Sequence, residues 1–572
     1  MHRQRSRRLT GLAIVAALLF APLAPRESAA ASDAGSTPSA DTAPVWKAQG
    51  GDARTLDLSG APVSADALAE QFRAAADTVS LTIRHLDQGG ALTADAATAI
   101  ANLDGTLNER IDIGAGEVTL HLPRGRYMLA SVVHTGPADE QTSSFLIQPL
   151  VELQTDSTVQ LDARGAKPLR VSTEDSAASS FLSALYVARR MDDGTMIQTD
   201  LRSDRLDRLT TAQLGPDVPA ADLTSSVVTY WGIAGPAGDF ADSPVTYSTL
   251  DTVRGRFFTG LHRVVRPAEM ATVVSHLHST SPDLNLTRSA TVIPPGVNGG
   301  WSRGLLYRQP QTVTEYIEAG ADTLAGIQER TEDTLVTDLS SLGSRTFQAG
   351  RRYELTWNKA VLGPNLESGW AGRYGDTMAT QIPMYSDQAG NWSWGAADAA
   401  STRMYRDGVL IAETDQPGDV GRADVGPGPA RFRLESHVDR PHLTQRSTTV
   451  DAVWNFSSDT AGKDGEPLPL WLLRFQPRVG PYNDAPSGSS VLPFTAKPNP
   501  GAKLGRVRLP VVRVSGDGGK SWRPATVVPK GQGRYVGVFA LPGAKTISLR
   551  ASAADSAGNT IDQTLLNAYA IR

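Results

Sequence analysis

Cysteine is absent from all 572 residues of the chain. This absence excludes disulfide bonds, thiolate metal sites and catalysis by a cysteine nucleophile. Stability must therefore come from the burial of apolar side chains, helped where needed by bound ions.

Long apolar runs are missing after residue 31, where no segment approaches the roughly 20 apolar residues that a transmembrane helix needs. The one apolar run is Leu9–Ala24, which follows four arginines in the first eight residues and precedes the small residues Ser28–Ala31. This order is typical of a secretory signal peptide. Residues 1–31 are predicted to be that peptide, so the protein is expected to be secreted and extracellular, with no membrane span.

Acidic residues slightly outnumber basic ones: the chain contains 60 Asp and Glu and 55 Lys and Arg, which gives a net charge of −5. Cleavage after Ala31 would remove five arginines and one glutamate, which leaves the mature chain near −9. A surface of this sign repels phosphate backbones, and no basic run interleaved with aromatic residues is evident. Nucleic acid is therefore not expected as a partner.

Helical periodicity is also scarce, and Ser64–Ala76 is the best candidate for a short helix because an N-cap serine precedes apolar residues at helical spacing. Elsewhere, short runs alternate apolar and polar residues between turns, and the chain contains 53 Gly and 36 Pro. The turn at Gly516–Gly519 and the alternating runs that follow it show this pattern most clearly. The predicted fold is all-β: several tandem β-sandwich domains, immunoglobulin-like or prealbumin-like, with few short helices.

The turns and composition shifts predict six segments along the chain. The motif LPRGRY at residues 122–127 resembles the turn of small prealbumin-like sandwiches. The segments are a signal peptide (1–31), a leader with the short helix (32–78), a prealbumin-like β-sandwich (79–166), a β-rich middle region (167–345), a large β-sandwich (346–500) and an immunoglobulin-like C-terminal domain (501–572).

Several stretches, including YELTWNKAVLGP, STRMYRDGVLIAET and VSGDGGKSWRPA, occur in the same order in a known class of protein. They resemble the non-catalytic C-terminal tail of actinobacterial secreted subtilisin-like serine peptidases, from about residue 80 to the end. The catalytic domain of that family is missing here, and the sequence contains no HGT motif for a catalytic histidine. The resemblance implies secretion and a modular architecture, and it does not imply proteolysis.

One pattern typical of hydrolases occurs, in Gly300–Gly304 (GWSRG), which matches the G-x-S-x-G nucleophile elbow and makes Ser302 a candidate nucleophile. The elbow requires an apolar strand before the serine and a helix after it. The preceding residues, PPGVNG, instead indicate a loop, so a glycine-rich loop is the favoured interpretation and no catalytic residue is predicted.

Two histidine pairs and two acidic turns are candidate metal sites. His276 and His278 would share one face of a strand, whereas His437 and His442 form a looser pair. No third ligand is evident for either pair. Asp387 with Asn391, and Asp555 with Asn559, could contribute oxygen ligands to calcium. Neither turn is rich in carboxylates, as a calcium site would require. No metal and no cofactor is therefore predicted.

Three tryptophans, Trp370, Trp392 and Trp394, are the predicted binding residues, with Tyr374 near them. Alternate strand positions share a face, so Trp392 and Trp394 should both be buried or both be exposed. If exposed, the indoles could stack on sugars. Packing in the core of a sandwich, beside Trp357 or Trp454, is the commoner outcome.

The segment Ser515–Trp522 matches the Asp-box pattern S-x-D-x-G-x-[ST]-W, for which a structural role in the hairpin is predicted. Taken together, these features favour a secreted, non-catalytic β protein that binds an extracellular protein, the cell wall or a polysaccharide. An accessory or remnant partner of a secreted peptidase is the alternative. An independent serine hydrolase is the weakest interpretation.

Overall fold

The computed structural model describes residues 54–73, 75, 77–341, 343–488 and 490–572, so the predicted signal peptide and about half of the leader lie outside the described residues. Strands dominate, which confirms the all-β fold class. The described helices are α1 (Ala65–Gln71) and three single 3-10 turns, Ala163–Gly165, Leu206–Arg208 and Pro267–Glu269. As predicted, Ser64 caps α1, since its hydroxyl accepts a hydrogen bond from the amide of Ala67 at 3.2 Å.

The N-terminal part of the molecule is a sandwich of a three-stranded and a seven-stranded sheet. Alternate residues of the outer strands, such as Leu81, Ile83 and Leu120, are fully buried between the two sheets. The outer sheet has the order β5-β2-β8, with β2 (Thr78–Leu86), β5 (Glu117–Pro123) and β8 (Ser157–Asp162). The inner sheet has the order β15-β9-β12-β7-β6-β3-β4, with β3 (Ala96–Asn102), β4 (Asn108–Ile111), β6 (Gly125–Thr135), β7 (Thr142–Leu153), β9 (Lys167–Thr173), β12 (Leu209–Gln213) and β15 (Leu261–Val265).

An eight-stranded sheet packs against the other face of the seven-stranded sheet, and both of its own faces are covered. Successive residues of β10 therefore enter different cores: Leu185 and Val187 face the seven-stranded sheet, whereas Ala184 and Tyr186 face a further sheet. The order is β1-β11-β10-β13-β14-β19-β16-β22, with β1 (Arg54–Thr55), β10 (Ala178–Arg190), β11 (Met196–Ser203), β13 (Leu223–Ile233), β14 (Val245–Arg254), β16 (Ala271–Leu277), β19 (Gln311–Ile317) and β22 (Arg352–Trp357).

The sheet on that second face has five strands and closes the stack. The core between the five- and eight-stranded sheets contains Trp357 of β22, which is 1% exposed and lies beneath the guanidinium group of Arg288. Arg288 in turn forms a buried ion pair with Glu315, at 2.8 Å. The order is β18-β17-β20-β21-β25, with β17 (Asn285–Ile293), β18 (Leu305–Tyr307), β20 (Asp322–Arg330), β21 (Leu335–Ser340) and β25 (Trp392–Trp394).

The C-terminal part is built from a four-stranded and a twelve-stranded sheet around the largest core, in which Trp454 is completely buried. The smaller sheet has the order β28-β24-β23-β31, with β23 (Trp370–Tyr374), β24 (Thr377–Gln381), β28 (Gly421–Asp424) and β31 (Glu466–Pro467). The larger follows β27-β26-β29-β30-β39-β38-β35-β36-β37-β34-β32, with β33 (Asp484–Ala485) beside β39. Its other strands are β26 (Ala399–Arg406), β27 (Val409–Thr414), β29 (Ala430–Asp439), β30 (Thr449–Ser458), β32 (Trp471–Phe475), β34 (Val491–Pro498), β35 (Val511–Ser515), β36 (Arg523–Gly531), β37 (Arg534–Val538), β38 (Thr546–Ala554) and β39 (Thr560–Ile571).

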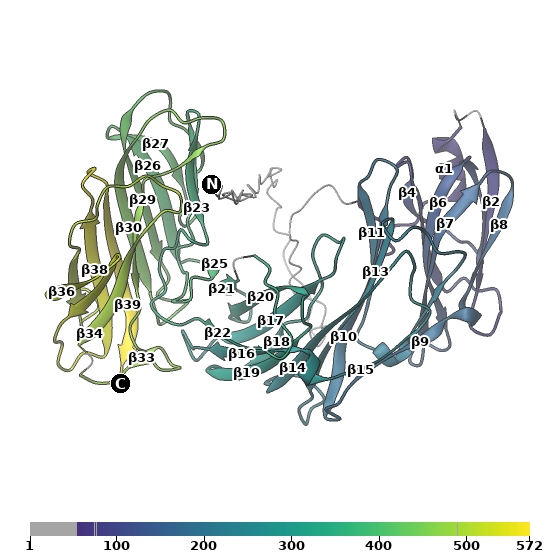
Figure 1. Cartoon of the computed structure of the whole chain (residues 1–572), viewed down its shortest axis with the longest axis horizontal. Helices are drawn as coiled ribbons and strands as arrows, with labels where there is room; N and C mark the ends of the chain where they lie inside the picture. The colour runs from purple at the N-terminus through teal and green to yellow at the C-terminus, as the bar shows by residue number, and fades with distance from the viewer. Residues whose placement is uncertain (1–53, 74, 76, 342, 489) are drawn as a thin grey trace, which may run out of the picture.

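Strand pairing crosses each of the three limits predicted between the β domains. β12 joins the N-terminal sheet beside β7, and β22 extends the eight-stranded sheet beside β16. β39 pairs with β30, although the predicted limit at residue 500 lies between them. The segments follow one another along the longest axis, so β2 and β36 lie near opposite ends of a curved molecule (Figure 1).

Buried polar groups join the middle sheets to the C-terminal part, and we call this region the polar joint (His278, Ser279, Asn358, Arg440 and Asn483). The side-chain amide of Asn483 donates to the carbonyl oxygens of Ser279 and Asn358. Arg440 is 1% exposed, and its guanidinium group donates to Thr337 Oγ1 at 2.8 Å and to the carbonyl of Val336 in β21.

Candidate binding surface

Trp370 and Tyr374 form a pair of exposed aromatic side chains on β23. Their relative exposures are 37% and 42%, and their ring centroids lie 6.3 Å apart in an edge-to-face arrangement. Gly372 lies between them, where an added Cβ would approach the Tyr374 ring to 3.2 Å. The pair therefore makes a continuous aromatic surface, and the indole Nε1 of Trp370 donates to Gln381 Oε1 at 3.3 Å.

Trp392 and Trp394 lie on β25 at the edge of the five-stranded sheet, opposite Ser340 and Asp338. Trp394 is 52% exposed and Trp392 is half-buried, whereas Ser393 between them is buried. The burial of Ser393 agrees with a shared face for the two indoles, although Trp392 is less exposed than Trp394. The interpretation of these indoles as core packing is wrong for Trp394. No contact in the described structure brings Trp370 together with Trp392 or Trp394.

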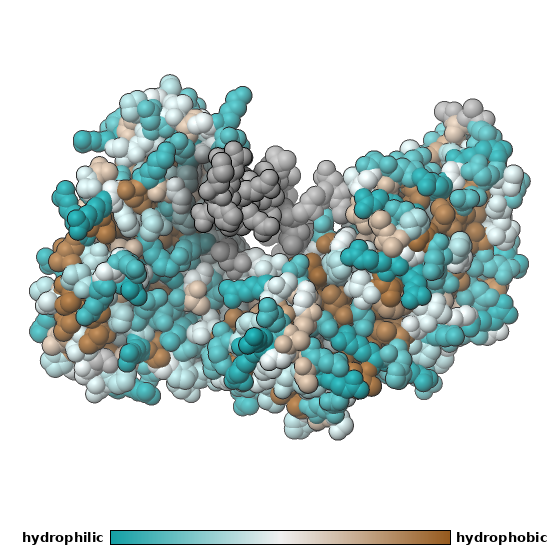
Figure 2. Space-filling model, in the orientation of Figure 1, coloured by the Kyte–Doolittle hydropathy of each residue, from teal (hydrophilic) through white to brown (hydrophobic). Residues whose placement is uncertain are grey.

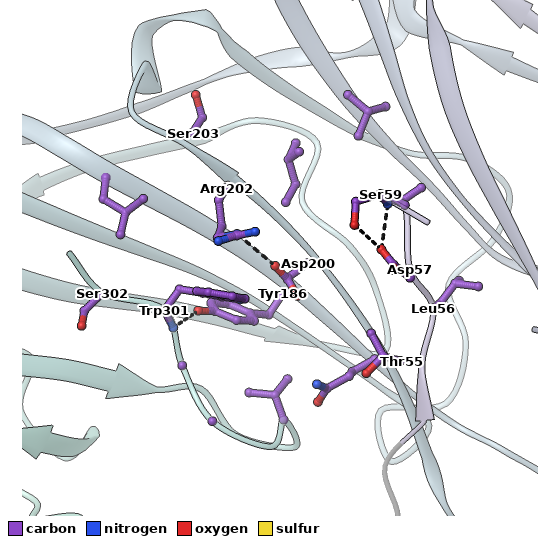
Figure 3. Close-up of a pocket in the computed structure, with 18 of the residues that line it drawn as sticks. Thr55, Leu56, Asp57, Ser59, Tyr186, Asp200, Arg202, Ser203, Trp301 and Ser302 are labelled. Carbon is purple, nitrogen blue, oxygen red and sulfur yellow. Dashed lines mark hydrogen bonds and ion pairs between the residues drawn. The ribbon is translucent and has the colours of Figure 1, made fainter. Parts of the chain in front are cut away.

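Ser302 lines a pocket of about 970 Å³ that also contains His134, Asp57 and Asp200. Its hydroxyl group is, however, hydrogen-bonded to Thr291 Oγ1 at 2.5 Å, and His134 is bonded to Ser143 Oγ at 3.0 Å. The hydroxyl is also turned away from the Arg202–Asp200 pair (Figure 3). Among the residues that the structure describes, Ser302 forms no recorded hydrogen bond with a histidine.

The glycine before Trp301 also has a structural explanation. A Cβ at Gly300 would lie 2.2 Å from the carbonyl oxygen of Val292, so only glycine fits where this loop crosses β17. The loop precedes a three-residue strand, β18, and none of the described residues after it forms a helix. The G-x-S-x-G match therefore arises from loop packing, which agrees with the glycine-loop interpretation.

The residues that line the pocket include four that the sequence did not single out: Tyr186, Asp200, Arg202 and Trp301 (Figure 3). The Arg202 guanidinium lies 3.6 Å from the Trp301 ring centroid and 3.8 Å from the Asp200 carboxylate. The amide of Trp301 donates to Tyr186 Oη at 2.6 Å. Burial raises the pKa of Asp200, and the charge of Arg202 opposes that rise. These side chains thus satisfy one another and hold the loop against β11.

The histidine pairs do not converge on a metal site. Nε2 of His276 contacts Glu354 at 2.6 Å, whereas His278 is buried and its Nδ1 donates to the carbonyl oxygen of Gly480 at 3.1 Å. His437 lies between Asp451 and Asp439, and His442 pairs separately with Asp398 at 3.4 Å. Within the described ranges, no three or more histidine, aspartate or glutamate side chains are arranged so that they could hold a metal ion.

The two acidic turns share one arrangement, in which the carboxylate closes the turn. Asp555 accepts hydrogen bonds from the amide and the side chain of Asn559, both at 2.9 Å. Asp387 does the same with Asn391, at 3.2 and 2.9 Å. Further N–H donors, including the indole of Trp471 on Asp555, occupy the remaining oxygen positions. The carboxylate oxygens therefore accept hydrogen bonds from N–H groups of the turn. This shared structural role explains why both turns have the sequence D-x-A-G-N.

The Asp-box turn shows the contacts expected of a structural hairpin. Asp517 accepts hydrogen bonds from the hydroxyl groups of Ser515 and Ser521 at 2.6 and 2.5 Å. These bonds hold the pKa of the Asp517 carboxyl well below its usual range. Trp522 lies under the guanidinium group of Arg550, at 4.6 Å.

No protein-family model and no curated protein matches the chain. Weakly similar solved structures are the Bacillus anthracis TIE protein (9% identity, covering 49% of this chain and 50% of that chain, TM-score 0.12) and BcpA, the major pilin subunit of Bacillus cereus (8%, 49% and 99%, TM-score 0.11). This chain thus spans about half the length of the TIE chain. Similarity this low carries no argument, so the fold class rests on the observed sheets, and the resemblance to peptidase tails stays a prediction.

The described helices contain no segment long and apolar enough to cross a bilayer.

Proposed function

We propose that this chain is an exported, non-catalytic binding protein whose exposed aromatic side chains hold an extracellular or cell-wall polysaccharide. The observation that carries the proposal is the Trp370–Tyr374 pair on β23, in which both rings are exposed and share one surface. Aromatic faces bind the apolar faces of sugar rings, and strands hold such rings at a fixed spacing.

The exposure of Trp370 differs from that of the tryptophans that pack in the cores of the sheets. Trp357 and Trp454 are at most 1% exposed, and Trp471 is 8% exposed. Burying an aromatic side chain is worth about 1.5–3 kcal/mol. Leaving Trp370 and Trp394 at the surface therefore forgoes stability, which supports a role in binding.

The absence of catalysis is part of the proposal, and the contacts of Ser302 support it. A serine nucleophile needs a base within hydrogen-bond reach, and here its hydroxyl is bonded to Thr291 instead. The alternative role, as an accessory partner of a secreted peptidase, rests only on the sequence resemblance.

Affinity electrophoresis of the chain without residues 1–31, in gels containing a panel of neutral and acidic polysaccharides, tests the proposal. We expect retardation in at least one gel, and a loss of affinity of about tenfold or more in Trp370→Ala/Tyr374→Ala, equivalent to about 1.4 kcal/mol. Tyr482→Ala is the matched control, because Tyr482 is a 56% exposed aromatic residue outside β23.

Retardation that both the double variant and the control leave unchanged would place binding elsewhere. Hydrolysis of casein or a simple ester by the chain, abolished in Ser302→Ala, would instead identify a hydrolase.

A further inference from the structure

Charge is distributed very unevenly along the chain, although its net value is small. The C-terminal module (residues 501–572) contains eleven Lys and Arg against three Asp and Glu, a net charge of +8. The N-terminal module (residues 54–166) contains seven against fifteen, a net charge of −8. These modules lie at opposite ends of the longest axis (Figure 1). The protein is therefore a strong electric dipole along its length.

The basic end carries an exposed apolar surface, which we call the valine face (Val491, Pro493, Val528, Val536 and Val538). Cross-strand pairing places these side chains together: Val491 is opposite Val538, and Val536 lies between Pro493 and Val528. Val491, Val538 and Val528 are 55%, 42% and 37% exposed. Figure 2 shows hydrophobic residues gathered on the surface at this end, over β36 and β34. Contiguous exposed apolar residues mark interaction surfaces.

Exposed arginines lie on the strands around the valine face without carboxylate partners. Arg513 on β35 is directly opposite Arg550 on β38, an arrangement of like charges that disfavours the isolated sheet. Arg534 lies two residues from Val536 on the same side of β37. None of the three forms an ion pair within the described part of the chain. An acidic surface would relieve this repulsion and cover the valines.

We propose that copies of this chain associate end to end, with the valine face and its arginines on the acidic N-terminal module of the next copy. The two contacting surfaces are different and lie at opposite ends, so the contact is heterologous and leaves both outer ends free to add further copies. The attraction between exposed charges is screened by salt, whereas the apolar contact is not. The assembly should therefore grow at low ionic strength and shorten as salt is added.

Sedimentation velocity of the chain without residues 1–31, at about 20 mM and about 500 mM salt, tests the proposal. We expect species heavier than one chain at low salt, increasing with protein concentration and lost at high salt. Arg513→Glu/Arg534→Glu and, separately, Val491→Ser/Val538→Ser should shift the sample to monomer. Arg351→Glu/Arg422→Glu is the control, because it makes the same change in charge at exposed arginines outside both modules.

Complementation of two variants gives the sharper result. Asp66→Lys/Glu140→Lys/Glu152→Lys changes three exposed carboxylates of the N-terminal module for which no side-chain hydrogen bond or ion pair is recorded. This variant and Arg513→Glu/Arg534→Glu should each be monomeric, since each lacks one half of the contact. Mixed together, they retain one unaltered contact, between the valine face of the first variant and the N-terminal module of the second, and should form a complex that neither variant forms alone.

Three outcomes would overturn the proposal: a wild-type chain that stays monomeric at low salt, a mixture that forms no complex, or a control that dissociates as the Arg513 variant does. A monomer that is retained on heparin through the same arginines would assign the valine face to an anionic polysaccharide. Circular dichroism and melting of each variant, unchanged from wild type, separate loss of association from loss of folding.

Discussion

Two of the contacts between the sheets of this protein differ in chemistry. The joint between the seven- and eight-stranded sheets is apolar, with side chains such as Met128, Phe145, Leu185 and Val227 packed between them. The polar joint, by contrast, consists of buried side chains that donate to specific carbonyl oxygens. Apolar packing depends on volume and tolerates adjustment, whereas hydrogen bonds depend on direction. The apolar joint should therefore tolerate change, and the polar joint should fix the orientation of the two halves.

The largest effect is expected from Arg440→Met at the polar joint. Loss of the guanidinium leaves Thr337 and the Val336 carbonyl without their donor and leaves buried Glu329 without a nearby cation. We expect a loss of about 3–5 kcal/mol in the free energy of unfolding, measured by urea denaturation.

Arg440→Lys should not restore this stability, because an ammonium group cannot reproduce both the planar stacking on Tyr385, at 3.9 Å, and the bonds to β21. A variant of exposed Arg513, Arg513→Met, is the control and should change stability by less than about 0.5 kcal/mol. Full stability of Arg440→Lys would contradict the directional character of this joint.

A slightly smaller effect is expected from Leu185→Ala at the apolar joint, where the side chain is completely buried. The cavity left by the smaller side chain should lower the free energy of unfolding by about 3 kcal/mol. Leu185→Met nearly conserves the volume and should cost less than about 1.5 kcal/mol, in contrast to Arg440→Lys. If both conservative variants lost the same stability, the two joints would not differ as we describe.

Acidification should weaken the polar joint through His278. Burial lowers the pKa of this imidazole from 6.5 to about 4, so the unfolded chain binds the proton more readily between those values. Stability contributed by neutral His278 is present above pH 6.5 and is lost as the pH falls, by about 2 kcal/mol between pH 7 and pH 5.

The measurement is the difference in unfolding free energy between wild type and His278→Gln across this pH range. The difference removes the contribution of Asp338, whose pKa burial raises to about 7 and which therefore destabilises the folded state as the pH rises. A constant difference from pH 7 to pH 5 would show that His278 does not titrate in this way.

The smallest effect on stability is expected at the binding surface, which belongs to neither joint. Trp370→Ala removes a side chain that is already partly exposed, and it should change the free energy of unfolding by less than about 1 kcal/mol. A loss as large as that of Leu185→Ala, in the same urea titration, would mean that Trp370 is a packing residue.

The alternation of apolar and polar residues was sufficient to predict strands that have one buried face and one exposed face, because such strands leave a local pattern in the sequence. Leu81, Ile83 and His85 alternate in the sequence and are all buried on β2. β10 lacks this pattern because both of its faces are covered, which explains why the sequence predicted only a β-rich region, without a domain type, for residues 167–345.

The surroundings of the candidate residues could not be predicted in the same way. Alternation placed Trp392 and Trp394 on one face, but it could not decide whether a neighbouring sheet covers that face. The pocket was missed because Asp57, Tyr186, Arg202 and Trp301 meet only through long-range strand pairing. Trp301 lies about 100 residues from Asp200 and Arg202 along the chain, so no local pattern indicated the pocket.

Sheets shared across segments make this protein hard to divide. A fragment ending at residue 166 would lack β12, and the backbone N–H and C=O groups of β7 that pair with it would become a bare edge. Such edges recruit strands from other chains and promote aggregation. Forms that lack a strand of a shared sheet are therefore expected to precipitate, and a proteolytic cut in the middle of the chain would expose sheet edges on both sides of the cut.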